Sequence, residues 1–226
     1  ERKNSLVRPS VANVDQAIVV ASVKSPDFDS YLLDKLLTVI SYHRIKPVIC
    51  FTKLDLLSDL EKENIEKVMK YYQDDGYEVF TNDDIDGLKH IFKDKITVLT
   101  GQSGAGKSSL LNRISPTLKL KTNEISYALN RGKHTTRHTE LYEVVDGYIV
   151  DTPGFSNVDF HGMDKYAIRD NMNEMFSFLE HCKYRDCMHI KEDGCYVKKM
   201  VECGDILKSR YDNYVHFISD KEGERR

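Results

Sequence analysis

Residues 96–111, with the sequence ITVLTGQSGAGKSSLL, hold the clearest chemical signal in the chain. The first five of these residues are β-branched or apolar and predict a buried strand, and the residues from Lys107 onward predict the start of a helix. Between them lies the pattern G-x-x-x-x-G-K-S from Gly101 to Ser108, which is the spacing of a phosphate-binding P-loop. The sequence therefore predicts that this chain binds a nucleoside triphosphate.

The residue types of this loop match the chemistry of phosphate binding. Glycines permit backbone conformations that turn successive N–H groups toward one anion, and the start of the helix adds its positive dipole. Lys107 would supply a charge for the β- and γ-phosphates, and Ser108 a hydroxyl for Mg²⁺. We therefore expect the nucleotide to contact the whole loop: Gly101, Gln102, Ser103, Gly104, Ala105, Gly106, Lys107, Ser108 and Ser109.

The composition sets modest limits on the class of protein. A chain of 226 residues can form one large domain and a small appendage, and its formal net charge of −3 gives no general argument for nucleic-acid binding. No apolar run reaches membrane-spanning length and there is no signal-peptide pattern, so we expect no membrane association. Four of the five cysteines fall in the last third, which favours metal ligands in a reducing cytoplasm over disulfides.

Apolar runs and helical patterns alternate along the chain. The predicted strands up to the P-loop are residues 17–23, 48–51, 77–80 and 96–100, and the predicted helices between them are residues 31–43, 58–72 and 83–92. Further on, residues 140–145 and 148–150 predict two strands joined by a hairpin turn at Asp146-Gly147. This alternation predicts an α/β fold, an open sheet with helices on both faces and its ligand at the carboxyl ends of the strands.

The last predicted strand ends in Asp151-Thr152-Pro153-Gly154. In P-loop enzymes an Asp at such a place acts on Mg²⁺ through water, and the N–H of the Gly can reach the γ-phosphate. An ordinary Asp-Pro-Gly turn is the alternative, but the position after a P-loop favours the functional interpretation. We therefore predict nucleotide contacts at Asp151 and Gly154.

The segment Thr52-Lys53-Leu54-Asp55 indicates which base is bound. A carboxylate such as that of Asp55 can accept the N1–H and N2 hydrogens of guanine, which adenine lacks, and the stem of Lys53 can lie across the base. The usual GTPase pattern is Asn-Lys-x-Asp, so Thr52 departs from it. From these residues alone, an exposed Lys-Asp turn remains the alternative.

The order of these motifs along the chain is unusual for a GTPase. Ordinary GTPases place the P-loop first and the guanine motif late, whereas here the guanine motif comes first and the Asp-Thr-Pro-Gly turn last. The same sheet can be wound this way if the chain is circularly permuted, which is permissible where termini lie close together. In that case the turn that senses the γ-phosphate leads directly into the C-terminal segment.

Four potential metal ligands lie near the C-terminus, at Cys182, Cys187, His189 and Cys195. Three thiols and one imidazole make up the Cys₃His set of a structural zinc site. The common Cys-x-x-Cys pairs are absent, so unrelated cysteines in a helical appendage are one alternative, and Cys203 as the fourth ligand is another. Residues 205–218 predict a terminal helix whose apolar stripe packs on this module.

The chain resembles a known family, the circularly permuted GTPases that depend on the small ribosomal subunit (RsgA). The resemblance covers nearly the whole chain and is carried by GQSGAGKSSL, by RGKHTT at residues 131–136, by residues 151–155 and by the cysteine cluster. It implies a GTP hydrolase that uses Mg²⁺, carries one structural zinc ion and acts late in maturation of the small ribosomal subunit. It also implies that the subunit and its rRNA are partners and that the subunit stimulates hydrolysis.

The resemblance further implies a division into two domains. A circularly permuted GTPase domain would occupy residues 1–160, and a small, mainly helical zinc-binding domain residues 161–226. Family members usually begin with an OB-fold RNA-binding domain, which we expect to be missing here because nothing precedes Glu1. We expect a cytoplasmic monomer that binds GTP and GDP.

Residues 117–138 are polar and basic, and their place between the P-loop and the Asp-Thr-Pro-Gly turn indicates a switch segment, with a solvated basic loop as the alternative. The resemblance implies that Thr135 or Thr136 closes on Mg²⁺. Many GTPases orient water with a Gln after this turn, but here Phe155 follows, so His134 is our candidate. The expected catalytic residues are Lys107, His134, Thr135 and Thr136, and the expected magnesium ligands are Ser108, Thr135 and Asp151.

Two other functions are compatible with parts of the pattern. One is a GTP-controlled binding module for a protein partner, in which hydrolysis is incidental. The other is a P-loop kinase for a small molecule, in which case Lys53 and Asp55 would be coincidental. A preference for GTP over ATP would argue against the kinase.

Overall fold

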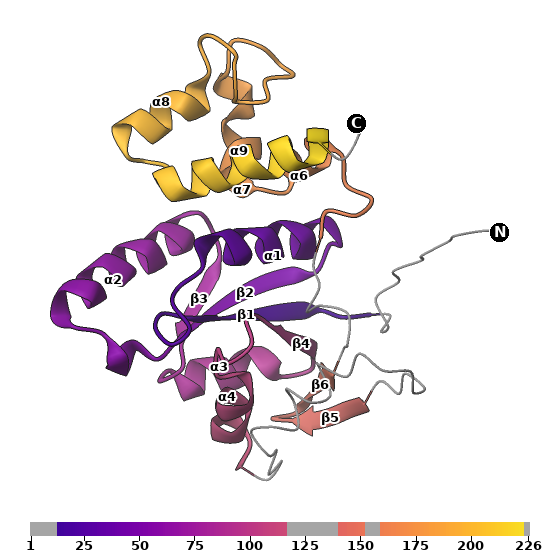
Figure 1. Cartoon of the computed structure of the whole chain (residues 1–226). Helices are drawn as coiled ribbons and strands as arrows, with labels where there is room; N and C mark the ends of the chain where they lie inside the picture. The colour runs from indigo at the N-terminus through magenta and orange to yellow at the C-terminus, as the bar shows by residue number, and fades with distance from the viewer. Residues whose placement is uncertain (1–12, 117–139, 152–158, 224–226) are drawn as a thin grey trace.

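A six-stranded sheet forms the centre of the molecule (Figure 1). The structure, a computed structural model, describes residues 13–116, 140–151 and 159–223 of the chain. The strands are β1 (Gln16–Ser22), β2 (Lys46–Thr52), β3 (Glu78–Thr81), β4 (Ile96–Thr100), β5 (Glu140–Val144) and β6 (Gly147–Asp151). Their order in the sheet is β3-β2-β1-β4-β6-β5, and only β5 runs antiparallel to its neighbour. The chain thus winds outward from β1 to one edge, returns to β4, and continues to the other edge.

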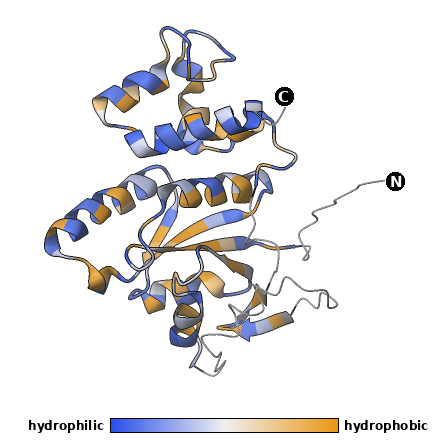
Figure 2. Ribbon diagram, in the orientation of Figure 1, coloured by the Kyte–Doolittle hydropathy of each residue, from blue (hydrophilic) through white to orange (hydrophobic). Residues whose placement is uncertain are grey.

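The central strands are apolar because both of their faces are buried. In β1, Ala17 and Val19 pack in the hydrophobic cluster on one face, whereas Ile18 and Val20 pack in the cluster on the other. Figure 2 shows β1 and its neighbour β2 as largely apolar. Because both faces of these strands are covered by apolar side chains, polar groups reach solvent at the strand ends, where the functional motifs are found.

Helices cover both faces of the sheet, as predicted. On one face lie α1 (Ser30–Tyr42) and α2 (Asp59–Asp74), and on the other α3 (Ile85–Phe92) and α4 (Lys107–Ile114). The Asp29 carboxylate caps α1 by accepting from the Leu32 N–H, and Ser58 with Glu61 forms a capping box at the start of α2. No helix in the described part of the chain is long and apolar enough to cross a membrane.

The hairpin between β5 and β6 is confirmed, but its turn lies one residue earlier than predicted. Val144 pairs with Gly147, so the two turn residues are Val145 and Asp146, with φ angles of 48° and 56°. This pair of left-handed residues matches the twist of the two strands. Gly147 belongs to β6 instead, and a Cβ there would lie 2.0 Å from the Phe92 carbonyl oxygen, so glycine is required by close packing.

The C-terminal elements form a helical module that lies over α1 (orange to yellow in Figure 1). The elements are α6 (Lys165–Asp170), α7 (Asn173–Ser177), the 3₁₀ turn η3 (Phe178–His181), α8 (Tyr196–Cys203) and α9 (Lys208–Gly223). The predicted terminal helix therefore begins three residues later and extends further than expected. Its Phe217 packs in one cluster with Val39 of α1, so the apolar stripe faces the α/β layer as well as the module.

Candidate functional site

The P-loop connects β4 to α4 at the carboxyl edge of the parallel strands. A Cβ on Gly101 would lie 2.2 Å from the Val20 carbonyl oxygen, so only glycine lets the loop leave β4 beside β1. Gly106 has φ +95° and is the N-terminal cap of α4, a conformation that strains any residue with a Cβ. The two glycines thus place the loop and the positive end of α4 together.

Lys107 lies in the first turn of α4 and turns back toward the loop. Its Nζ donates to the carbonyl oxygens of Gly101 and Gln102, at 2.7 Å each. Partial burial lowers the pKa of this amine to about 8. Burial disfavours the charged form of this amine, and a phosphate bound beside the loop would stabilise the ammonium form by its negative charge.

The remaining P-loop residues are divided between the core and the solvent. Ala105 and Ser108 are buried, whereas Ser103, Gly104 and Ser109 are exposed. Ser108 in the first turn of α4 is therefore held by packing, as a hydroxyl ligand of a nucleotide-bound Mg²⁺ requires. β6 runs parallel beside β4 and ends at Asp151, so the backbone of this residue reaches the same edge of the sheet.

The predicted guanine loop leaves β2 and is fastened directly to the P-loop. The Oγ1 of Thr52 donates to the Ala105 carbonyl oxygen at 2.7 Å, although the two residues are 53 positions apart. The Nζ of Lys53 donates to the Gly104 carbonyl oxygen at 2.9 Å and to the Ser25 carbonyl oxygen. The hydroxyl of Thr52 thus links the two loops in spite of the departure from the usual Asn.

Asp55 lies in a short 3₁₀ turn, η1 (Leu54–Leu56), that follows Lys53. The carboxylate is exposed, so a guanine base can reach it from solvent. Together, the two loops place a carboxylate beyond the end of β2 and the P-loop with the N-terminus of α4 beyond the end of β4, with β1 between them. This arrangement suits a ligand with a base at one end and phosphates at the other.

Ser25 is a part of this site that the sequence did not predict. Its carbonyl accepts from Lys53, and its φ of 53° turns the chain after β1. The signal for it in the sequence is Pro26, which follows the predicted strand at residues 17–23 and points to a turn there.

Part of the predicted site lies outside the described residues. This applies to the predicted catalytic residues His134, Thr135 and Thr136 and to Gly154 of the Asp-Thr-Pro-Gly turn. Their roles therefore stay predictions. The described residues support nucleotide binding, and the water-orienting group is a separate proposal.

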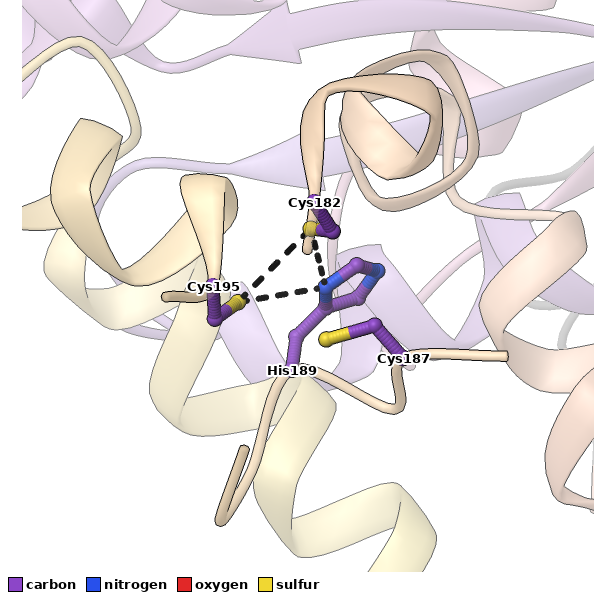
Figure 3. A group of neighbouring side chains, drawn as sticks. All are labelled: Cys182, Cys187, His189 and Cys195. Atoms are coloured by element: carbon purple, nitrogen blue, oxygen red, sulfur yellow. Dashed lines mark hydrogen bonds between the residues drawn. The ribbon is translucent and has the colours of Figure 1, made fainter. Parts of the chain in front are cut away.

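The four predicted metal ligands come together in the C-terminal module (Figure 3). Their ligand atoms, from Cys182, Cys187, His189 and Cys195, all lie within 4.8 Å of one another. The Cys182 and Cys195 sulfurs are 4.0 Å apart, and His189 Nδ1 lies 3.6 Å and 3.3 Å from them. A tetrahedral zinc site has S···S edges of about 3.8 Å and S···N edges of about 3.5 Å, so the group has suitable dimensions. Cys203, the alternative ligand, is exposed at the end of α8 and is not part of this group.

The protonation chemistry of this group fits a divalent cation. Burial and the neighbouring Cys195 raise the pKa of Cys187 to about 12, and burial also raises the pKa of Cys195. Burial lowers the pKa of His189, which keeps the imidazole neutral. Its Nε2 donates to the Met175 carbonyl oxygen at 3.0 Å, so Nδ1 carries the lone pair and faces the sulfurs. A cation at the centre would stabilise the thiolates that the fold otherwise disfavours.

Comparison with known proteins identifies close relatives along the whole chain. The family model described as RsgA GTPase matches residues 1–161. The small ribosomal subunit biogenesis GTPase RsgA of Enterococcus faecalis is 48% identical, over 99% of this chain and 76% of the relative. Its counterpart from Bacillus subtilis is 45% identical, over 97% of this chain and 76% of the relative.

Two solved structures are similar to this fold. YloQ, described as a circularly permuted GTPase, aligns with a TM-score of 0.80 and 38% identity, over 100% of this chain and 74% of YloQ. YjeQ from Thermotoga maritima aligns with a TM-score of 0.81 and 34% identity, over 99% of this chain and 77% of YjeQ. Both the matched length and the identity exceed what a shared fold alone would give. This chain belongs to the RsgA family of circularly permuted GTPases.

Proposed function

We propose that this GTPase acts late in the maturation of the small ribosomal subunit and that binding to the subunit stimulates its hydrolysis of GTP. The observation that supports GTP as the nucleotide is the direct bonding of the predicted guanine loop to the P-loop through Thr52 and Lys53. The names of the Enterococcus and Bacillus relatives support the ribosomal role. Neither alternative, a binding module with incidental hydrolysis or a small-molecule kinase, is favoured by these relatives.

In the proposed mechanism, the described residues bind and orient the nucleotide. Asp55 would accept the guanine N–H groups, the P-loop N–H groups and Lys107 would hold the β- and γ-phosphates, and Ser108 would ligate the nucleotide-bound Mg²⁺. When bound, that ion would offset the negative charge of the phosphates. Thr135 or Thr136, together with Asp151, would complete the magnesium site. Gly154 would contact the γ-phosphate.

His134 is the proposed group that orients the attacking water. A neutral imidazole can accept a hydrogen bond from water, and its unperturbed pKa lies near neutrality. Phe155 at the position after the Asp-Thr-Pro-Gly turn has no hydrogen-bonding side chain, so another residue must take this part. We propose that docking on the subunit places His134 beside the attacking water and thereby speeds hydrolysis.

We propose that residues 161–226 form a second domain with one structural zinc ion, bound by Cys182, Cys187, His189 and Cys195. Bound there, the ion would supply no chemistry to hydrolysis and would crosslink the loop between η3 and α8. We further propose that the protein acts in the cytoplasm as a monomer and contacts rRNA of the subunit.

The test is GTP hydrolysis by the chain with and without purified small subunits, with large subunits as the control. We expect stimulation by small subunits only, and a loss of about 100-fold or more in the stimulated rate for His134→Ala, the usual scale of a lost general base. GTP affinity of that variant should stay unchanged, whereas Lys107→Ala should weaken it. Equal rates with both subunits would contradict the proposed ribosomal role, and full stimulated activity of His134→Ala would contradict the role of His134.

A further inference from the structure

Glu192 lies in the loop between two of the proposed metal ligands, His189 and Cys195. Both oxygens of its carboxylate accept hydrogen bonds from the backbone of that loop. Oε1 accepts from the Met188 N–H at 2.8 Å, and Oε2 accepts from the N–H groups of Ile190 at 2.9 Å and Lys191 at 3.0 Å. Partial burial would raise the pKa of this carboxyl, but the backbone N–H groups outweigh burial and lower it. The side chain is therefore a charged acceptor. Its hydrogen bonds to Met188 and Ile190 bridge the two residues that flank His189.

His189 needs such support because its backbone is strained. Its φ is 60°, in the left-handed region that a residue with a Cβ rarely adopts. The carboxylate of Glu192 bonds the N–H groups on both sides of this residue, at Met188 and Ile190. The conformation that aims the imidazole at the sulfurs is thus held from both directions along the chain.

Two tyrosines of α9 hold the same stretch from its other side. The Tyr211 hydroxyl donates to the His189 carbonyl oxygen at 2.6 Å, and the Tyr214 hydroxyl donates to the Met188 carbonyl oxygen at 2.8 Å. With these bonds and the bond from Nε2 to Met175, both the backbone and the ring of His189 are fixed. The imidazole is therefore oriented by protein contacts alone.

We propose that Glu192 is the positioning residue that sets His189 in its ligating pose before the metal arrives. This inference rests on the proposed zinc site and adds to it a residue that never touches the ion. A preorganised ligand binds more tightly because less ordering is left for the binding step. Outer residues that orient metal ligands change affinity by about 10- to 100-fold when substituted.

The test compares Glu192→Gln with Asp193→Asn in the full chain. Each change removes one negative charge from the same loop, but Asp193 is exposed and is not among the partners of the His189 backbone. A Gln can present its oxygen to only one of the two groups of N–H donors, and its NH₂ then opposes the other. We expect Zn²⁺ affinity, measured by competition with a chelator, to fall about 10- to 100-fold for Glu192→Gln and to stay within about twofold of the parent for Asp193→Asn.

Two further readouts separate positioning from general destabilisation. With Co²⁺ as the probe, Glu192→Gln at saturation should keep the absorption spectrum of a tetrahedral sulfur-rich site while showing weaker binding. Tyr211→Phe, which removes one hydroxyl and leaves the ring, should weaken Zn²⁺ binding by a smaller factor. If Glu192→Gln binds Zn²⁺ as tightly as Asp193→Asn, or loses the tetrahedral spectrum, the inference is wrong. If the parent chain binds no Zn²⁺ at all, the proposed zinc site itself is wrong.

Discussion

Thr52 stands where the usual GTPase pattern has Asn, and its hydroxyl shows what this position has to supply. The bond from Oγ1 to the Ala105 carbonyl oxygen links the predicted guanine loop to the P-loop. Thr52 is almost fully buried, so the bond is protected from water. A hydroxyl is sufficient because the acceptor lies within reach of a short side chain.

We therefore expect Thr52→Val to weaken GDP binding about 2- to 10-fold, the scale of one net hydrogen bond. Valine keeps the shape of the side chain but leaves the Ala105 carbonyl without this partner. Thr52→Ser is the matched control and should bind GDP like the parent chain. Titration calorimetry measures all three, and unchanged affinity of Thr52→Val would show that the loops need no such tie.

Lys107 should give the proposed nucleotide affinity a defined pH dependence. Its pKa is lowered to about 8 by burial in the free chain, and a bound phosphate raises that pKa again. If the protonated amine binds phosphate as proposed, nucleotide affinity is highest below about pH 8, where the amine is charged in the free chain. Above this value it falls with rising pH, by up to about tenfold per unit, until the pKa of the complex is reached.

Calorimetry of GDP binding at pH 8.5 in buffers of different ionisation enthalpy should therefore show proton uptake. Lys107→Arg keeps its charge throughout this range and should show none, whatever its affinity. Equal proton uptake by the two chains would assign the proton to another group.

At the scale of whole elements, a buried ion-pair network joins the C-terminal helices to the α/β layer. The Arg210 guanidinium of α9 donates to Asp34 of α1 at 2.6 Å and, through two nitrogens, to Glu174 of α7 at 2.6 and 3.2 Å. The three charged side chains are each 3% exposed or less. Hydroxyls of Tyr72 and Tyr71 donate to the two carboxylates, so the charges are solvated by the protein itself.

Removing the cation from such a network leaves two buried carboxylates without their partner. We expect Arg210→Met to lower the free energy of unfolding by about 3–5 kcal/mol, measured by urea denaturation. Lys208→Met on the same helix is the control, because its ion pair with Asp212 is solvent-exposed and should contribute little. Similar shifts for both variants would mean that the network adds no more stability than a surface pair.

At the scale of the whole molecule, the proposed zinc site and the network would hold the C-terminal module by independent means. Metal binding energy is folding energy where a site does not exist in the unfolded chain. We expect Cys187→Ser to remove hydrogen-exchange protection from α8 and the loop before it, while β1, β2 and β4 stay protected. Cys203→Ser should leave the protection pattern unchanged, and equal protection in both variants would argue against a structural metal.

The parts of this molecule that the sequence predicted are those with a local pattern. The strands and helices around the P-loop follow from apolar runs and helical periods, and the turn beside Gly147 was misplaced by one residue because glycine is required there by packing on Phe92. Arg210 contacts Asp34 across 176 positions, and no local pattern relates two charges on separate helices. Likewise, the bond from Thr52 to Ala105 depends on two loops meeting in space.

The place of β1 in the sheet has a consequence for incomplete chains. β1 precedes the other strands of the sheet in the chain and lies at the centre of the sheet. One of its edges pairs with β2, and the other can pair only after β4 has been synthesised. A chain that ends before residue 96 would leave that second side as an open row of N–H and C=O groups on an apolar strand. Such open strands pair with other molecules. We therefore expect premature termination in this region to yield aggregates instead of a smaller soluble protein.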